Sequence, residues 1–209
     1  FVFYMAREVK SLKYQSLAGF SDYQIKEHHE VIYAEEVREL NEIENKLLAA
    51  SRSLADGLPN DLRELKAEEI EAKNGVKLHE MYFANLGAGR GKAVGEVAKM
   101  IERDFGSFEA WKTQFGALAS KGWVMLAYDL DDNRLINYIS DTENRVGVWN
   151  AIILLVLDVS EHAYFLDKST NRMGYIETFF KSIDWDYVNL AAHQYGIIER
   201  RKNNEKLHL

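Results

Sequence analysis

An aspartate and a histidine follow the longest uncharged apolar run of the chain. The run AIILLVL ends at Leu157, and Asp158 and His162 come next, four residues apart. Two more histidines, His28 and His79, lie inside long helical patterns, so only a folded core would bring the four side chains together. Three neutral imidazoles and one carboxylate form a mixed nitrogen and oxygen ligand set. Such a set suits iron or manganese, because the carboxylate favours a hard cation and the imidazoles accept a transition metal.

A plainer interpretation is that each histidine is an ordinary core or surface residue, and spacing alone does not overturn it. The sequence has no local metal-binding pair of the CxxC or HExxH kind. It has no cysteine, which excludes disulfides, thiol catalysis and cysteine-ligated zinc or iron–sulfur centres. His29 is expected to point about 100° round the helix from His28, and His193 and His208 are not expected to be ligands either.

The elements that must position this ligand set begin with two long helical patterns. From Ser21 to Leu54 the apolar residues recur at helical spacing behind a serine cap, with no helix breaker, which predicts one long helix. Gly57 and Pro59 end it, and a second helix is predicted over residues 61–85. Together they predict an antiparallel helical hairpin in the first part of the chain.

The second half of the chain has shorter elements. Its predicted helices cover residues 93–105, 107–121, 175–183 and 185–196, and its predicted strands cover 123–130, 134–140 and 148–159. The charged tail ERRKNNEK is expected to be solvated. We therefore predict an α+β protein, with an N-terminal helical hairpin domain over residues 1–90 and a C-terminal α/β domain over residues 91–209.

Composition excludes several classes of protein. With 209 residues, of which 47% are hydrophobic, the chain is long enough to bury a substantial core. A net charge of −7 argues against nucleic-acid binding, because no basic stripe is available to displace counterions from phosphate. No apolar run approaches the roughly 20 residues of a membrane-spanning helix, so no membrane partner is expected. We expect a cytoplasmic location, although a targeting segment removed before Phe1 would leave no trace.

The segment after the buried strand carries a resemblance to a known family. Asp158-Val-Ser-Glu-His-Ala-Tyr164 is similar to the D-x-W-E-H-A-Y signature of the iron/manganese superoxide dismutases. The segments DFGSFEAWKTQF, GWVMLAYD and YIETFFKSIDWDYV are also close to family segments in order and spacing. The resemblance extends from about Gly19 to Tyr195. It implies an N-terminal helical hairpin and a C-terminal half with a three-stranded antiparallel sheet, with the metal between them.

The resemblance also implies a function and a ligand set. The family ligands fall on four residues of this chain, namely His28, His79, Asp158 and His162. They would hold one iron or manganese ion per subunit, and the sequence does not distinguish the two metals because the family binds both with the same ligands. The implied function is that of an antioxidant enzyme, an oxidoreductase that converts superoxide to oxygen and hydrogen peroxide. Glu161 matches the glutamate that crosses the family's dimer interface, which implies a homodimer or homotetramer.

Three positions depart from the family pattern. Glu36 stands where the family usually has a tyrosine at the substrate channel, and its spacing from His28 places it toward the pocket mouth. The alternative is a register shift in which Tyr33 replaces it. Glu143 stands where the family has a glutamine or histidine that contacts metal-bound solvent, and Ser160 replaces the signature tryptophan. The aromatic wall would be rebuilt from Tyr82, Phe83 and Trp123, of which Trp123 matches the family's pocket tryptophan.

These departures leave several roles open for the two glutamates. If ionised they would repel superoxide and stabilise the oxidised metal. If they share a proton they would form a relay. A third alternative is that one of them binds the metal or helps to hold a second ion. We therefore predict a superoxide dismutase, with two alternatives: an enzyme of the same fold with different redox chemistry on another small oxygen species, or a homologue that has lost turnover.

Overall fold

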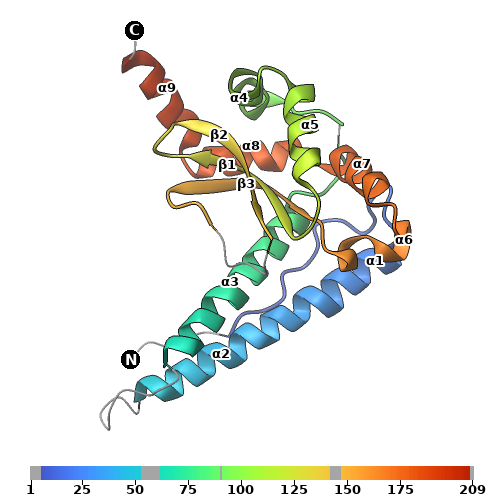
Figure 1. Ribbon diagram of the computed structural model, residues 1–209, viewed down its shortest axis with the longest axis vertical. Helices are drawn as coiled ribbons and strands as arrows, with labels where there is room; N and C mark the ends of the chain where they lie inside the picture. Colours follow the sequence, from blue (N-terminus) through green and yellow to red (C-terminus); the bar gives the residue numbers. More distant parts are fainter. Residues whose placement is uncertain (1–5, 53–61, 90, 142–146, 208–209) are drawn as a thin grey trace.

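The structure is a computed structural model that describes residues 6–52, 62–89, 91–141 and 147–207 (Figure 1). Its first half contains α1 (Asp22–Lys26), a π-helix (Glu27–Tyr33), α2 (Ala34–Arg52) and α3 (Leu62–Ala84). Its second half contains α4 (Gly95–Phe105), α5 (Phe108–Leu118), β1 (Trp123–Asp129), β2 (Arg134–Ser140), β3 (Ala151–Asp158), a 3-10 turn (Glu161–Ala163), α6 (Phe165–Lys168), α7 (Arg172–Ser182), α8 (Trp185–Gln194) and α9 (Ile197–Leu207). The predicted α+β class is confirmed.

Helices α2 and α3 lie side by side as the predicted hairpin, which extends away from the rest of the molecule (Figure 1). A buried ion-pair cluster joins them, because the Lys73 ammonium lies 3.1 Å from Glu44 on α2 and 2.9 Å from Glu69 on its own helix. Both carboxylates are more than nine-tenths buried and share this cation, and Glu69 is also paired with Lys66 at 2.7 Å. The cluster fixes how the two helices sit against each other, and α3 carries His79.

The prediction of one uninterrupted α-helix from Ser21 was wrong in one respect. Ser21 does cap the helix, since its hydroxyl accepts the Gln24 amide at 3.0 Å. Between α1 and α2, however, residues Glu27–Tyr33 form a π-helix. A π-helical turn contains more residues than an α-helical turn, and such turns are frequent at functional sites. Both His28 and His29 lie on this π-helix, and both are buried.

The sheet has the strand order β2-β1-β3 and is antiparallel throughout. Helices α4 and α5 pack on β2 and β1, whereas α3 and α8 pack on β3. Strand β1 is buried over its first six residues and β3 over its last five, which explains why both read as apolar runs. Asp158, the last residue of β3, is the register partner of Trp123 at the start of β1. This register places the aspartate beside the pocket tryptophan.

The prediction of a solvated tail holds for Glu199, Arg200, Lys202 and Asn203, which are exposed, but it was wrong for Arg201. Residues of the ERRKNNEK segment belong to helix α9, and Arg201 is only 6% exposed. Its guanidinium binds the Asp104 carboxylate through two hydrogen bonds of 2.7 and 2.8 Å. Asp104 also accepts the Leu135 amide at 2.8 Å, so the pair connects α9, α4 and β2. Arg201 therefore anchors α9 together with Ile197 and Ile198, which are buried in the core at the start of the helix.

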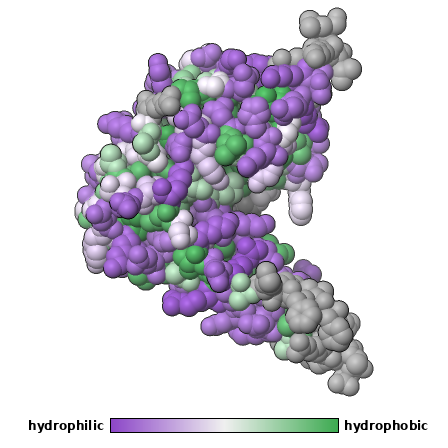
Figure 2. Space-filling model, turned by 180° about the vertical axis from the view of Figure 1, so that it is seen from behind, coloured by the Kyte–Doolittle hydropathy of each residue, from purple (hydrophilic) through white to green (hydrophobic). Residues whose placement is uncertain are grey.

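The face of the molecule turned away in Figure 1 is mostly hydrophilic, with apolar side chains in small scattered groups (Figure 2). None of the helices within the described residues combines the length and the apolar character that crossing a lipid bilayer requires.

Candidate metal centre

The site is assembled around the carboxylate of Asp158, which is completely buried at the end of β3. The backbone amide of Ser160 donates to Asp158 Oδ1 at 2.8 Å, which fixes the carboxylate and leaves Oδ2 facing the interior. The 3-10 turn that follows brings His162 back toward the strand end. His162 Nε2 lies 2.9 Å from Asp158 Oδ2. The apolar strand thus delivers an acid into the core, and the turn places an imidazole against it.

The other two histidines reach the same oxygen from the helical hairpin. His28 Nε2, from the π-helix, lies 3.1 Å from Asp158 Oδ2, and His79 Nε2, from α3, lies 3.7 Å from it. One ligand atom from each of these residues and His162 lies within 4.8 Å of all the others. The structure therefore brings together all four residues that the sequence singled out.

The orientation of the nitrogens fits a cation better than a hydrogen-bond network. His28 Nε2 and His79 Nε2 are buried, and neither has a hydrogen-bond partner among the described residues. Buried nitrogen atoms without partners are costly, unless a bound ion accepts their lone pairs. Three imidazole nitrogens converging on one carboxylate oxygen suit a transition metal such as iron or manganese. The residues present therefore fit the metal that the sequence predicted.

The metal-free titration behaviour of these groups reflects burial and mutual contact. Burial lowers the pKa of His28 to about 4, although the adjacent Asp158 carboxylate opposes this. Burial by itself would raise the pKa of Asp158, but the close contacts and charge interactions of its carboxylate with His162 and His28 hold that pKa well below its usual range. Burial opposes protonation of His79, yet contacts with Glu36 and Asp158 raise its pKa. An ionised Asp158 is the form that binds a cation.

Two buried polar residues that the sequence analysis missed hold the ligand segment in place. Gln24 is completely buried, donates from Nε2 to the carbonyl of His162 at 2.7 Å and accepts the Leu166 amide at 3.1 Å. The Tyr175 hydroxyl donates to the carbonyl of Asp158 at 2.6 Å. The sequence signal for Gln24 was a polar residue four positions before His28, on the face that had to be buried.

Aromatic rings surround the centre. The ring of His28 lies 5.1 Å from that of Tyr82 and 4.9 Å from that of Phe83, measured between centroids. The ring of His79 lies 4.9 Å from that of Trp123, edge to face. These three aromatic residues are the ones that the sequence analysis expected to form the wall. They cover the rings of His28 and His79, and both of these histidines are 1% exposed.

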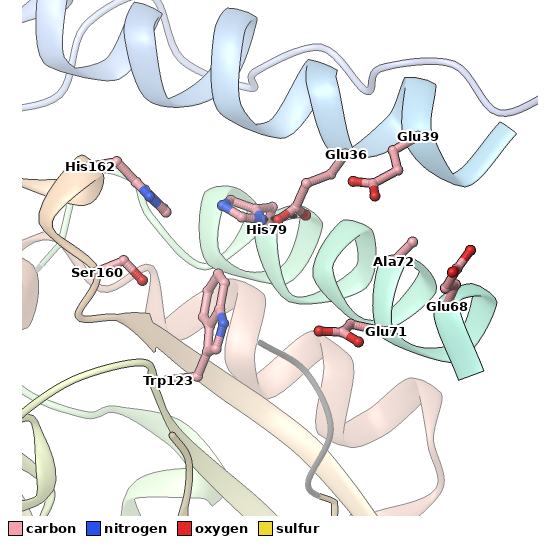
Figure 3. A pocket seen from close by; sticks show the side chains of 9 residues that line it. All are labelled: Glu36, Glu39, Glu68, Glu71, Ala72, His79, Trp123, Ser160 and His162. Atoms are coloured by element: carbon pink, nitrogen blue, oxygen red, sulfur yellow. Dashed lines mark hydrogen bonds and ion pairs between the residues drawn. The ribbon is translucent and has the colours of Figure 1, made fainter. Parts of the chain in front are cut away.

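A cavity of about 180 Å³ leads from the surface to the candidate ligands His79 and His162 (Figure 3). Trp123 and Ser160 line its inner end, and four glutamates line the remainder: Glu36, Glu39, Glu68 and Glu71. The Glu36 carboxylate lies 2.9 Å from Nδ1 of His79. Glu143, the other predicted acidic residue, lies outside the described residues. The mouth of the site is therefore acidic over the part of the chain that the structure describes.

Tyr33 and His29 have contacts away from this cavity. The Tyr33 hydroxyl accepts the Lys10 amide at 3.1 Å and donates to Glu80 at 3.2 Å. His29 Nε2 donates to the Lys10 carbonyl at 2.8 Å. Both side chains attach the N-terminal segment to the helical hairpin, and Tyr33 does not take the position of Glu36 in the cavity.

Comparisons with known proteins agree with this geometry. Residues 93–191 match the family model for iron/manganese superoxide dismutases, C-terminal domain. The superoxide dismutase [Fe] of Aquifex aeolicus is 40% identical over 184 residues, which cover 85% of this chain and 86% of the relative. The chain belongs to the iron/manganese superoxide dismutase family. The family resemblance read from the sequence is therefore confirmed.

Other similar proteins are also superoxide dismutases, and their names specify iron in some cases and manganese in others. The superoxide dismutase [Fe] of Cupriavidus metallidurans is 37% identical over 175 residues, covering 81% of this chain and 86% of the relative. The superoxide dismutase [Mn] of Haloarcula marismortui is 39% identical over 124 residues, covering 58% and 60%. Similarity to superoxide dismutases of both kinds means that sequence identity does not decide which metal this one takes.

Proposed function

We propose that this protein is a superoxide dismutase that holds one iron or manganese ion on His28, His79, Asp158 and His162. The observation that carries the proposal is the convergence of three imidazole nitrogens on Asp158 Oδ2 at 2.9 to 3.7 Å. When bound, such an ion supplies one-electron redox chemistry, by which two superoxide ions and two protons become oxygen and hydrogen peroxide.

The chain's own residues supply orientation and access. Ser160 holds the carboxylate of Asp158 and Gln24 holds the carbonyl of His162, so these two ligands keep their direction. Trp123 and the other rings keep water from the buried nitrogens, and the cavity restricts access to a small species. We propose that Glu36 and Trp123 act at the substrate channel, and that Glu143, which lies outside the described residues, also takes part in the reaction.

The test is to load the protein with iron or with manganese, and then to measure metal content by elemental analysis and superoxide decay by stopped flow. We expect about one ion per chain and dismutase activity that requires it. His79→Gln should lose both, whereas His193→Gln should keep both, because His193 is a surface residue paired with Glu199 at 3.4 Å. Glu36→Tyr, which restores the usual family residue, should be measured beside the parent.

The alternatives predict different results. Stoichiometric metal without dismutase activity would favour an enzyme with other redox chemistry. Activity that appears only in Glu36→Tyr would mean that the parent has lost turnover through that position. Absence of metal from the parent would contradict the proposed function altogether.

We further propose a homodimer, alone or within a homotetramer, with Glu161 at the interface. Helix α6 contacts both α1 and the 3-10 turn that carries Glu161, and three large apolar side chains of the two helices are about half exposed, namely Tyr23 at 60%, Phe165 at 49% and Leu166 at 51%. The side chain of His162 is itself 34% exposed, which leaves its ring accessible to a partner's carboxylate. Light scattering should give at least twice the chain mass, and Glu161→Ala should weaken association. A monomeric parent at micromolar concentration would contradict the proposal.

We also propose a division of the chain into two domains and a cytoplasmic location. The division into residues 1–90 and 91–209 is supported by the family match, which begins at residue 93. A cytoplasmic location is supported by the absence of cysteine, which fits a reducing compartment.

A further inference from the structure

The contact between Glu36 and His79 ties a charged residue at the cavity mouth directly to a proposed metal ligand. His79 is 1% exposed, and its Nδ1 lies 2.9 Å from Glu36 Oε2 and 3.1 Å from the carbonyl oxygen of Gly75. The carbonyl oxygen of Gly75 and an ionised Glu36 carboxylate can only accept hydrogen bonds. Nδ1 of His79 therefore carries the proton and is the donor. The other ring nitrogen, Nε2, is then the unprotonated one, and it faces Asp158 and the cavity.

Two of the proposed ligands can be compared directly. His28 is as deeply buried as His79, but its Nδ1 has no hydrogen-bond partner among the described residues. His79 has a carboxylate at that position instead. A carboxylate that accepts the distal N–H of a ligating imidazole fixes the ring and makes it a stronger electron donor. A stronger donor stabilises the more highly charged, oxidised ion relative to the reduced one.

We propose that Glu36 is a positioning residue that aims Nε2 of His79 at the metal and, through this hydrogen bond, favours the oxidised state of the ion. This inference rests on the proposed function only in that a redox-active metal binds at His79. It assigns to Glu36 an action on the ligand, which is separate from any action on an incoming anion.

The chain offers a matched control for charge alone. Glu39 lies three residues later on α2 and lines the same cavity, but within the described residues its carboxylate forms no hydrogen bond or ion pair with His79. Glu39→Gln removes one negative charge from the mouth and leaves the hydrogen bond intact. Glu36→Gln removes the same charge and weakens the hydrogen bond, while nearly preserving shape. Glu36→Ala removes the acceptor completely, so Nδ1 keeps only the carbonyl of Gly75.

The experiment uses the iron-loaded full-length protein and its three variants. Redox titration with mediators gives the ratio of oxidised to reduced iron at a fixed potential, and competition with a chelator gives the relative affinity for iron. For Glu36→Gln we expect the ratio at the parent's midpoint to fall about tenfold, which is 59 mV for a one-electron couple. We expect affinity to fall about tenfold for Glu36→Ala. Glu39→Gln should change either quantity less than twofold.

Several outcomes would overturn the inference. One is an unchanged ratio in Glu36→Gln, and another is an equal change in Glu36→Gln and Glu39→Gln, which would mean that charge acts only through space. Thermal unfolding of the metal-free proteins identifies any variant that fails to fold, and Glu36→Gln then decides alone. An iron-loaded parent without dismutase activity would refute the proposed function, yet its redox ratio would still test Glu36. A parent that binds no iron would refute both.

Discussion

The acidic cavity should make superoxide reach this protein more slowly at low ionic strength than at physiological ionic strength. Four glutamates line the cavity, and among the described residues no lysine or arginine lines it. Superoxide carries one negative charge, so each ionised carboxylate repels it during approach. Added salt screens this repulsion, and we therefore expect the rate constant for encounter to increase with salt concentration.

The magnitude follows from Coulomb's law. A unit charge about 10 Å from the anion costs ~0.4 kcal/mol in water, so four such charges cost about 1.5 kcal/mol, or roughly a tenfold lower rate. At 0.15 M salt the Debye length is about 8 Å, and screening leaves roughly a third of that energy. We expect kcat/KM of the metal-loaded protein to rise about fivefold between a few millimolar salt and 0.15 M.

Stopped-flow measurements of superoxide decay at constant pH would test this, with a salt whose anion does not bind the metal. Glu68→Gln should raise kcat/KM about twofold at low salt and change it little at high salt. Glu102→Gln changes the net charge of the protein equally, but Glu102 is an exposed residue of α4 outside the cavity, so it should have little effect. A rate that falls with added salt, or equal effects of the two substitutions, would refute the reasoning.

Three further predictions concern stability of the metal-free protein, measured by urea unfolding. Because burial lowers the pKa of His28 to about 4, from about 6.5 in the unfolded chain, stability present above pH 6.5 is lost as pH falls toward 4. The loss between pH 7 and pH 5 should be about 2 kcal/mol, and His28→Gln should lack it. Tyr175→Phe leaves the buried carbonyl of Asp158 without its donor and should cost about 1–3 kcal/mol, whereas no change would show that the 2.6 Å bond contributes nothing net. Arg201→Met leaves Asp104 buried without its cation and should cost about 3–5 kcal/mol, of which the double change with Asp104→Asn should recover part.

The elements that position the site were largely predictable, because their apolar periodicity and caps are local. The helix predicted over 61–85 is observed at Leu62–Ala84, and the three predicted strands correspond to β1, β2 and β3. The grouping of His28, His79, Asp158 and His162 was not predictable from spacing, since the four residues lie on separate elements. It came from the family resemblance, which carries information about long-range contacts that periodicity does not.

The features that the sequence does not predict are the π-helix and the burial of certain polar residues. The π-helix has no composition that distinguishes it from an α-helix, so the apolar spacing predicts an α-helix over the whole segment. Gln24 and Arg201 are polar residues that became buried because each finds partners more than ninety residues away in the chain. A polar residue gives no signal of such a partner in its own neighbourhood, and composition alone favours the exposed interpretation.

Glu36 has two proposed actions, one on the approach of superoxide and one on the ligand His79, and salt should separate them. Its spacing from His28 placed it at the cavity mouth, but its hydrogen bond to Nδ1 of His79 depends on a helix 43 residues further along the chain. As one of four charges at the mouth it acts through solvent, so its effect on the rate of encounter should disappear at high salt. As the acceptor for a ligand that is 1% exposed it acts through a direct contact that salt does not screen. At 0.5 M salt, Glu36→Gln should therefore still change the ratio of oxidised to reduced iron, but it should no longer change the rate of encounter with superoxide. If the change in the redox ratio also disappeared with salt, Glu36 would act only as one more negative charge at the cavity mouth.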